Sequence, residues 1–396
     1  MIDSMRILMI APQPFYEERG TLIAIDLLLR ALAGRGDEVD LLTVHLGENR
    51  SYAGLRIFRV RPWLRPRVIK SGLSWAKIWC DLFLFFAAIQ LIRQNNYRLI
   101  HAVEEAGFMA LVIGKMFHTP FVFDVDSSMT TQIIDRFKWL SPVTRLLKWL
   151  ESIPARHAAA IVPMCDSLAE DIARVSSQKV FVLNDVCLPG DPEATVDDLR
   201  ELLEIQDELL VMYVGNLEPY QGIDLLLESF GKVIEAGTCC RLVIIGGRTE
   251  DVAKYRAQAD DLNIGQHVNF IGPRPVGALD KYLCQADLLV SPRIQGTNTP
   301  MKIYSYLGSG RAVVATNLQT HTQVMDDSIA ALAAPEAQAF ADAMVRVLGS
   351  EEERERLGKQ AAALAEEKYS WSAFKRQVDS IFDDLERDLT DSSLSG

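Results

Sequence analysis

The stretch DLLVSPRIQGTNTPMKIYSYLGSGRAVVAT (residues 287–316) decides the fold class of this chain. It opens with a short apolar run, passes through a polar loop, continues over a helical length (301–310) and ends in a second apolar run. Short apolar strands joined by helices are typical of a parallel sheet, whose strands are covered on both faces. Similar units recur in both halves of the chain, so the sequence predicts an α/β protein with doubly wound sheets.

The length of 396 residues suits two domains better than one core. A first series of strand and helix patterns ends near residue 190, and a second series begins at residue 209. Residues 191–208 are acidic and rich in turn residues, which indicates a linker. The predicted organisation is a Rossmann-like N-terminal domain (1–190), the linker (191–208), a Rossmann-like C-terminal domain (209–370) and an amphipathic helix (371–390) that crosses back to the first domain.

Composition excludes several classes of protein. With 49% hydrophobic and 24% charged residues, the chain is neither disordered nor fibrous. Its six cysteines form no CxxC pair and no His/Cys cluster with metal-ligand spacing, which favours reduced thiols in a cytoplasmic protein. The longest apolar run (78–92) contains Asp81 and Gln90 and falls short of ~20 residues, so we expect no membrane span there.

The net charge of −12 conceals a basic segment at 56–98, which carries +8 against −20 for the rest of the chain. Its basic residues are Arg56, Arg59, Arg61, Arg65, Arg67, Lys70, Lys77, Arg93 and Arg98. They adjoin an aromatic helix pattern, and residues 135–157 repeat the combination. Such segments suit an anionic lipid surface, so we predict a peripheral protein on the inner face of the membrane. Helices packed on the sheet with solvated charges are the alternative, and the acidic balance disfavours nucleic acid.

Several segments resemble the retaining GT-B glycosyltransferases of family 4. In the second half they are YVGNLEPYQGIDLLLESF (213–230), VIIGGR (243–248) and SPRIQGTNTPMKIYSYLGSGRAVVA (291–315). FYEERGTLIAIDLLLRALAGRGDEVDLLT (15–43) and the closing SW (370–371) are similar too. The resemblance implies a GT-B fold, with two Rossmann-like domains facing each other across a cleft. It also implies sugar transfer from a nucleotide-sugar with retention, without metal or cofactor.

The resemblance places the donor site in the second domain, with departures from the family pattern. Where relatives carry an Arg, a Lys and two Glu, this chain has Asn216, Gln221, Gln295 and Ser305. The loop before 301 leads into a helix whose first amides and dipole attract an anion. The predicted donor-binding residues are Gly20, Gly215, Asn216, Gln221, Gly222, Arg274, Arg293, Gln295, Gly296, Thr297, Asn298, Thr299, Lys302 and Ser305.

Arg293 and Lys302 are the candidates to supply the missing positive charge at the diphosphate. The structural alternatives are turn glycines, polar turn or cap residues, a solvated lysine and an arginine paired with a nearby acid. Ser305 fits a contact with the nucleotide ribose, and Gln295 fits a contact with the transferred sugar.

Acids follow two strands of the first domain and are the candidate catalytic residues. Asp126 stands where similar family members often have a His that contacts the sugar or acceptor, and an Asp there can orient an acceptor hydroxyl or take up its proton. Glu104 and Glu105 are the other candidates, and helix capping is the structural alternative for all three. His101 lies within a strand, which favours a core role. The Asp124–Val–Asp126 triplet is too weak a signal for a metal site, so we predict none.

The sequence thus predicts a hexosyltransferase that uses a UDP- or GDP-sugar and a glycan or lipid acceptor held by the first domain. The basic aromatic helices favour a lipid-linked or membrane-proximal acceptor. One rival is a non-catalytic GT-B partner or regulatory subunit that has lost its donor-site charges. A nucleotide-sugar epimerase of similar architecture is a further alternative.

Overall fold

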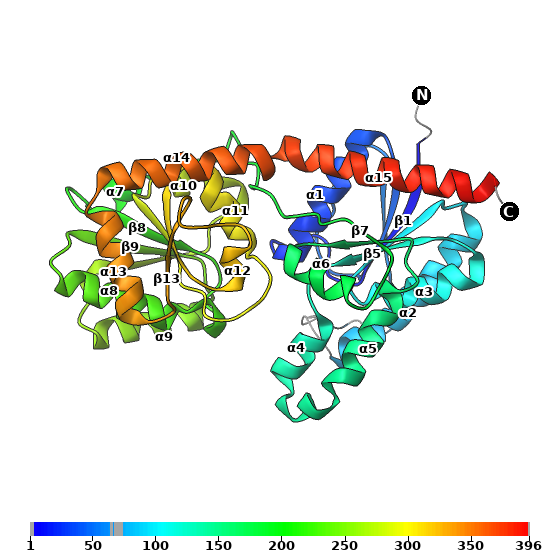
Figure 1. The fold of residues 1–396 in the computed structure, drawn as a ribbon, viewed down its shortest axis with the longest axis horizontal. Helices are drawn as coiled ribbons and strands as arrows, with labels where there is room; N and C mark the ends of the chain where they lie inside the picture. Colours follow the sequence, from blue (N-terminus) through cyan, green and yellow to red (C-terminus); the bar gives the residue numbers. More distant parts are fainter. Residues whose placement is uncertain (1–3, 64–65, 67–73, 395–396) are drawn as a thin grey trace. The chain divides into compact units, whose positions relative to one another are not determined.

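The computed structural model describes residues 4–63, 66 and 74–394 (Figure 1). Contacts divide the chain into two compact units, one of Met1–Asn184 with Lys375–Gly396 and one of Asp185–Phe374. Each unit contains a parallel sheet covered by helices, so the predicted α/β class with two Rossmann-like domains is confirmed.

The first unit is built on a seven-stranded sheet with the order β3-β2-β1-β4-β5-β6-β7, in which every neighbouring pair is parallel. The chain moves outward from β1 on one side and then on the other, so the order reverses between β1 and β4. The carboxyl ends of strands at such a reversal are the usual ligand site of α/β folds. The strands are β1 (Arg6–Ala11), β2 (Glu38–Thr43), β3 (Leu55–Arg59), β4 (Leu99–Val103), β5 (Phe121–Val125), β6 (Ala160–Pro163) and β7 (Lys179–Val180).

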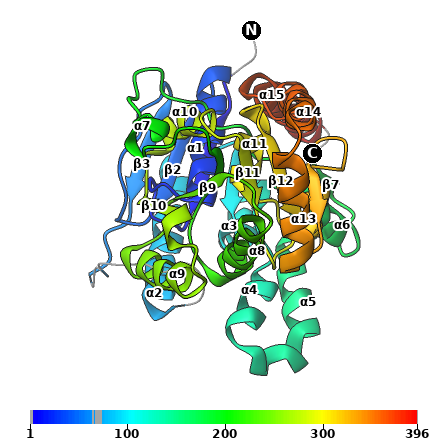
Figure 2. The same ribbon diagram turned by 90° about the vertical axis from the view of Figure 1, so that its left-hand side faces the viewer.

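Helices cover both faces of this sheet. Residues of α2, α3, α5 and α6 share one core with Ile100 and Ala102 of β4. Because alternate strand residues face opposite sides, His101 points to the other face, where its ring stacks on Phe382 of the C-terminal helix α15 (Trp371–Leu394). Figures 1 and 2 show residues 129–155 (α4, η1 and α5) as an arm that extends away from the sheet. The helices are α1 (Gly20–Arg35), α2 (Trp75–Gln94), α3 (Ala106–Phe117), α4 (Met129–Arg136), η1 (Lys138–Val143), α5 (Thr144–Ala155) and α6 (Asp166–Ala173).

The second unit repeats this plan with a six-stranded parallel sheet in the order β10-β9-β8-β11-β12-β13. Two apolar cores lie on its two faces, one with α8, α9 and α13 and one with α10, α11 and α14. The strands are β8 (Leu209–Val214), β9 (Cys240–Ile245), β10 (Val268–Gly272), β11 (Leu288–Ser291), β12 (Ala312–Thr316) and β13 (Ala331–Ala333). The helices are α7 (Leu199–Leu202), η2 (Pro219–Gln221), α8 (Ile223–Glu235), α9 (Thr249–Asp261), η3 (Gly265–His267), η4 (Val276–Ala278), α10 (Leu279–Leu283), α11 (Met301–Gly308), α12 (Gln319–Thr322), α13 (Ala337–Leu348) and α14 (Glu351–Lys368).

Residues 191–208 differ from the linker that the sequence predicts, because they pack on the second unit. Leu199 and Ile205 are buried in one of its cores. Lys281 Nζ donates to the carbonyl oxygens of Pro192 and Ala194, both at 2.7 Å. The division between the units instead falls after Asn184.

The C-terminal helix α15 contacts the first unit from Lys375 onward. Arg35 Nη1 donates to Asp383 Oδ1 at 2.9 Å, and Gln377 Nε2 donates to the Val182 carbonyl at 2.5 Å. Arg35 also binds Asp37 through Nε at 3.0 Å, and these two side chains are only 7% and 3% exposed. Arg35 therefore joins α1, the start of β2 and α15.

Replacing Arg35 by Ala should lower the free energy of unfolding by about 2–4 kcal/mol, because Asp37 then remains buried without its cation. Chemical unfolding followed by circular dichroism measures the change. The matched control is Arg387→Ala on the same helix, whose side chain is 73% exposed and whose loss should cost less than about 0.5 kcal/mol. Equal effects of the two substitutions would contradict the role of Arg35.

Candidate active site

In the second unit, strand order reverses between β8 and β11, and the residues that follow these strands lie close together. Lys302, on the first turn of α11, reaches this place. Its Nζ donates to Gln221 Oε1 at 3.3 Å and lies 3.9 Å from the centre of the Tyr213 ring. It also lies 3.5 Å from where a Cβ on Gly215 would stand. The structure thus brings together Gly215, Gln221 and Lys302 from three separate segments.

Arg293 holds the loop between β11 and α11 in shape. Its guanidinium donates to the Gln295 carbonyl through Nε at 2.7 Å and to Asn298 Oδ1 through Nη2 at 3.2 Å. It also stands over the Tyr220 ring, 5.3 Å from the centre. Gly296 has a φ of +117°, and a Cβ there would collide with the guanidinium. Only glycine fits this position without strain.

Arg293 and Lys302 form a pair of cations that lacks an acidic counterpart. Across residues 4–63, 66 and 74–394, no carboxylate lies within ion-pair distance of either group. Burial lowers the pKa of both, and the charge of Arg293 lowers the pKa of Lys302 further. Buried charge without a partner is costly, and such perturbed groups mark candidate functional sites. An anion bound beside them would supply the missing charge.

His321 supports this loop, and sequence analysis did not identify it. The side chain is fully buried. Its Nδ1 donates to the Thr316 carbonyl at 2.8 Å, so Nε2 accepts from Ser291 Oγ at 2.9 Å. Burial lowers its pKa to about 3, which keeps the imidazole neutral near pH 7. Thr316 Oγ1 in turn donates to the Arg293 carbonyl at 2.5 Å. The one available signal was the position of His321 soon after a strand end.

Five further predicted residues belong to the same loops. Gly222 immediately precedes α8 with a φ of 74°, and a Cβ there would meet the Pro292 carbonyl. The carbonyls of Thr297 and Asn298 accept from Gln323 and Thr320. Thr299 is buried, and its hydroxyl has no partner in the described part of the chain.

Asn216 is the fifth of these residues. Its Oδ1 accepts from the Glu218 amide at 3.4 Å, and its Nδ2 lies 3.5 Å from Tyr220 Oη. It therefore shares Tyr220 with the Arg293 loop.

Two predicted residues of this unit, Arg274 and Ser305, bind partners other than the two cations, and Gln295 contacts Arg293 only through its backbone carbonyl. Arg274 donates to the Ile271 carbonyl at 2.6 Å and to Tyr282 Oη at 3.2 Å. Ser305 Oγ accepts from the Leu188 amide at 3.4 Å. The Gln295 side chain is exposed, and Gly20 is the first residue of α1 in the other unit.

In the first unit, residues that follow β1, β4 and β5 meet on one carboxylate. Gln13 Nε2 donates to Glu104 Oε2 and Ser127 Oγ donates to Glu104 Oε1, both at 2.9 Å. Glu104 has a φ of +50°, which is uncommon for a residue other than glycine and is often found at functional sites. Burial, with the neighbouring charge of Glu105, raises the pKa of Glu104 to about 7.

Glu105 contacts α2 instead. It forms an ion pair with Lys77, whose Nζ also donates to the Pro12 carbonyl at 2.8 Å. Asp81, one turn further along α2, faces the same lysine, and burial raises its pKa to about 7. Glu104, Glu105 and Asp81 therefore share Lys77 as a counter-ion.

Helix capping does not account for the three candidate acids. α4 is capped by Ser128, and Glu151 accepts from the Met129 amide at 2.7 Å, while Asp126 is buried at the end of β5. Glu105 precedes α3 without a capping hydrogen bond.

The Asp124–Val–Asp126 triplet is likewise engaged in the core, because Asp124 Oδ2 lies 2.9 Å from His101 Nε2. His101 is buried in a strand, as the sequence predicts. Among the described residues, no group of three or more His, Cys, Asp or Glu side chains is placed to hold a metal ion.

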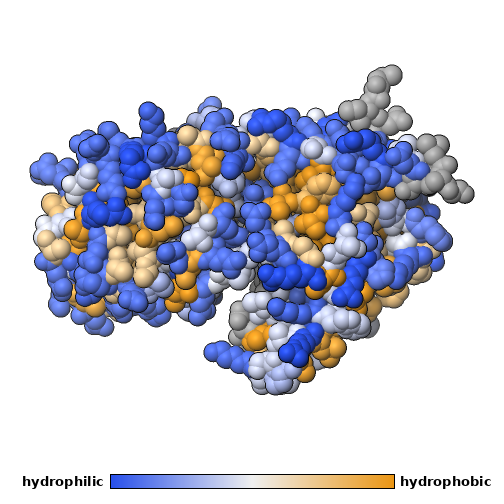
Figure 3. All heavy atoms as spheres, in the orientation of Figure 1, coloured by the Kyte–Doolittle hydropathy of each residue, from blue (hydrophilic) through white to orange (hydrophobic). Residues whose placement is uncertain are grey.

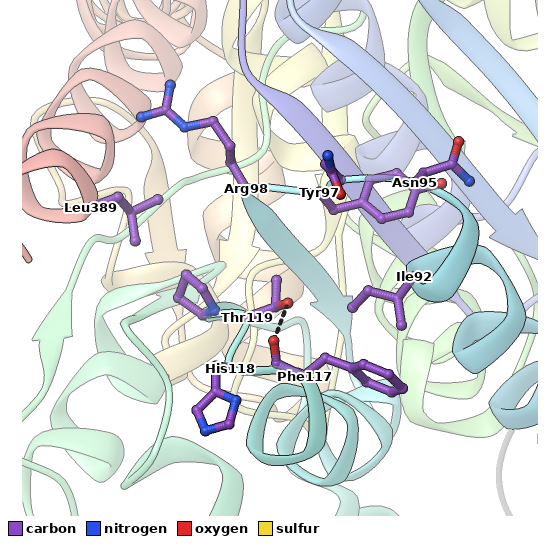
Figure 4. Close-up of a pocket in the computed structure, with 10 residues that line it drawn as sticks. Ile92, Asn95, Tyr97, Arg98, Phe117, His118, Thr119 and Leu389 are labelled. Atoms are coloured by element: carbon purple, nitrogen blue, oxygen red, sulfur yellow. Dashed lines mark hydrogen bonds between the residues drawn. The ribbon is translucent and has the colours of Figure 1, made fainter. Parts of the chain in front are cut away.

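A hollow of about 430 Å³ lies at the amino ends of β4 and β5, at the opposite end of these strands from Glu104 (Figure 4). Arg98, at the start of β4, lines it and donates to Glu386 at 3.1 Å. Tyr97 donates to Asp40 and Thr119 donates to the Phe117 carbonyl, so these polar groups already have partners. Glu104 follows the other end of β4. We therefore do not assign a substrate to this hollow.

Two protein-family models match the chain, one over each half. Residues 19–183 match "Glycosyl transferase 4-like domain", and residues 195–364 match "Glycosyl transferases group 1". Among characterised relatives, the α-D-kanosaminyltransferase of Streptomyces kanamyceticus is 23% identical over 291 residues, which cover 71% of this chain and 74% of the relative. The phosphatidyl-myo-inositol mannosyltransferase of Mycobacterium leprae is 28% identical over 176 residues, which cover 44% of this chain and less than half, 46%, of the relative.

Solved structures share the fold over nearly the whole chain. Sucrose-phosphate synthase from Thermosynechococcus elongatus has a TM-score of 0.78 at 19% identity and covers 97% of this chain and 99% of its own. Anabaena HepE, solved with UDP and glucose, has a TM-score of 0.74 at 14% identity and covers 96% and 100%. With both halves matched in order on this shared fold, the chain belongs to glycosyltransferase family 4 and has the GT-B fold.

Proposed function

We propose that this family 4 enzyme transfers a hexose from a UDP- or GDP-sugar to a lipid-linked or membrane-proximal acceptor, with retention and without a metal ion. The observation that carries the proposal is the pair of cations, the buried Arg293 and the partly buried Lys302, without an acidic partner in the described chain. A nucleotide diphosphate carries the negative charge that would balance this pair of cations.

The two cations also favour an enzyme over a regulatory subunit without donor-site charges. Gln221 stands where relatives carry a lysine, and Lys302 Nζ hydrogen-bonds to the Gln221 side chain. The positive charge is therefore still present near this position, although α11 supplies it. Charge-assisted hydrogen bonds to phosphate are roughly twice as strong as neutral ones. Anabaena HepE, which shares the fold, was solved with UDP, and this supports a UDP-sugar donor here.

In the proposed reaction, the bond between the anomeric carbon and the diphosphate breaks, and a bond to the acceptor oxygen forms on the same face of the sugar. Arg293, Lys302 and the first amides of α11 stabilise the charge that develops on the diphosphate. The departing diphosphate takes the acceptor proton. Glu104, with its φ of +50° and its contacts to Gln13 and Ser127, is the group that would orient the acceptor hydroxyl.

The acceptor assignment depends on the apolar surface of the first unit. On α2, Trp75, Ile78, Leu82 and Phe86 are 48–87% exposed at a spacing that places them on one face. On the arm, Trp139, Leu146 and Trp149 are 76%, 54% and 52% exposed, beside the exposed Lys138, Arg145 and Lys148. Figure 3 shows apolar side chains along this arm. An exposed apolar face flanked by lysine and arginine suits the interface of an anionic bilayer.

Among the described helices, α2 alone is long and apolar enough to cross a membrane, judged by length and composition, and 33% of its most apolar window is buried in the fold. Its inner face carries Lys77, which is paired with Glu105, and this favours a helix lying in the interface over one that spans it. The phosphatidyl-myo-inositol mannosyltransferase relative supports a lipid acceptor by its name.

The basic segment contributes less to this surface than the sequence suggests. Arg56 binds Asp40 through two hydrogen bonds of 2.6 Å, and Arg59 binds several backbone carbonyls, so both arginines have structural partners. Arg65, Arg67 and Lys70 lie outside the described residues. The membrane proposal therefore depends on the basic residues of the arm.

Replacing Lys302 by Met should weaken binding of the preferred nucleotide-sugar by about tenfold or more, because a charge-assisted hydrogen bond contributes about 1.5–3 kcal/mol. Isothermal titration calorimetry with UDP-glucose and GDP-mannose measures the affinity. Lys359→Met, at an exposed lysine of the same unit, is the control and should bind like the wild type. Unchanged affinity of Lys302→Met would remove Lys302 from the site.

The acceptor kcat/KM should rise with pH through about 7, because Glu104 orients a hydroxyl as its carboxylate and its pKa is raised to about 7. Glu104→Gln should remove this inflection and reduce kcat/KM by about tenfold to a hundredfold. Asp81→Asn is the matched control, because Asp81 has a similarly raised pKa and lies beside Lys77. An inflection that disappears in Asp81→Asn and persists in Glu104→Gln would contradict the assignment.

Changing Trp139, Leu146 and Trp149 together to Ser should reduce flotation with vesicles of anionic phospholipid by about tenfold or more, through lost apolar burial. The matched control changes Leu202 and Leu262, which are 51% and 37% exposed in the second unit, to Ser. The control protein should float like the wild type. Undiminished flotation of the arm variant would end the membrane proposal.

A further inference from the structure

The surroundings of Lys302 hold titratable groups of several kinds but no acid in the described chain. Arg293 approaches from the loop after β11, Tyr213 from β8 and Tyr220 from η2. Tyr306 lies on α11 itself, and His321 approaches from α12. None of these groups carries a negative charge near neutral pH, and one is a permanent cation.

The ammonium form of Lys302 is therefore weakly stabilised in the free protein. Its favourable contacts are the Gln221 side-chain oxygen at 3.3 Å and the face of the Tyr213 ring at 3.9 Å. Against them stand burial and the charge of Arg293, and together these lower the pKa of Lys302 well below its ordinary value. Buried lysines elsewhere are known to lose their proton near neutral pH for the same reasons.

A bound diphosphate would reverse this balance. Its negative charge favours the ammonium form of a lysine within a few ångströms, and it also offsets the repulsion from Arg293. The neutral amine can act only as a weak hydrogen-bond partner for phosphate, whereas the ammonium can make charge-assisted hydrogen bonds.

We infer that donor binding is coupled to proton uptake, with Lys302 Nζ receiving the proton as the diphosphate enters the site. This inference rests on the proposed function. The proton comes from solvent, and no covalent bond of the donor changes in this step. The site therefore carries more positive charge when the donor is bound than when it is empty. A neutral sugar cannot induce the second charge, so the coupling favours ligands that carry a diphosphate.

The sign of the pH effect follows from linkage. Where the free protein holds fewer protons than the complex, affinity decreases as pH rises, by at most about tenfold per pH unit for one proton. Below the pKa of Lys302 in the free protein, both states hold the proton and affinity becomes constant. Binding is therefore tighter on the acid side of this range.

The test is calorimetric titration of the full chain with UDP-glucose and with GDP-mannose in buffers of different ionisation enthalpy. Nucleotide-sugars are preferable to free UDP, whose terminal phosphate itself titrates near neutral pH. We expect the apparent enthalpy to vary with the buffer, with a slope that corresponds to uptake of up to about one proton per donor. Lys302→Arg should bind the donor with a slope near zero, because guanidinium keeps its proton throughout.

Two results would overturn the inference while leaving the proposed function intact. One is donor binding by the wild type without proton uptake and with constant affinity between about pH 6.5 and 9. The other is uptake that persists in Lys302→Arg, which would assign the proton to another group such as His321. If Lys302→Arg does not bind the donor, the pH dependence of donor affinity in the wild type decides whether the inference holds. Failure of both nucleotide-sugars to bind the folded wild type would overturn the proposed function itself.

Discussion

The unbalanced positive charge of Arg293 and Lys302 is the constraint on which the rest of this site depends. Buried cations ordinarily have acidic partners, since otherwise the cost of desolvation is not recovered. Here neutral groups offset part of that desolvation cost. These groups are two tyrosine rings, the Gln221 amide and the carbonyls of the Arg293 loop. The energy of a bound anion would compensate for the remainder.

The fold explains why these groups meet although they are far apart in sequence. Gly215 follows β8 and Arg293 follows β11, and the two strands pair at the point where the strand order reverses. Beneath them, His321 joins Ser291 of β11 to Thr316 of β12. The first unit repeats this arrangement, because Gln13 and Glu104 follow β1 and β4 at its own reversal. In both units, the pairing of two strands brings together the loop residues that follow them.

Much of this could be read from the sequence, because strand and helix patterns are local. The fold class follows from short apolar runs, and the family follows from several characteristic segments that occur in order along the chain. The segment 191–208 has the composition of a linker, and its packing on the second unit depends on a few apolar residues and on partners such as Lys281, about 90 residues away.

Other parts of the site were not readable from local pattern. Gln13 meets Glu104 across 91 residues, and His321 meets Ser291 across 30. No spacing rule reveals such contacts, because they arise only when the sheet forms. The basic segment was hard to interpret for a related reason: Arg56 and Arg59 look like free surface charges in sequence, yet Asp40 of β2 binds Arg56 and backbone carbonyls such as that of Phe15 bind Arg59.

Gly296 has a consequence for engineering this enzyme. Its backbone angle and the nearby guanidinium leave no room for a side chain, so a directed-evolution library gains nothing by varying it. The adjacent Gln295 and Thr297 have exposed side chains and can change without disturbing the loop's internal hydrogen bonds, in which only their backbone carbonyls take part. A library can therefore vary these two flanking positions while the glycine between them is kept fixed.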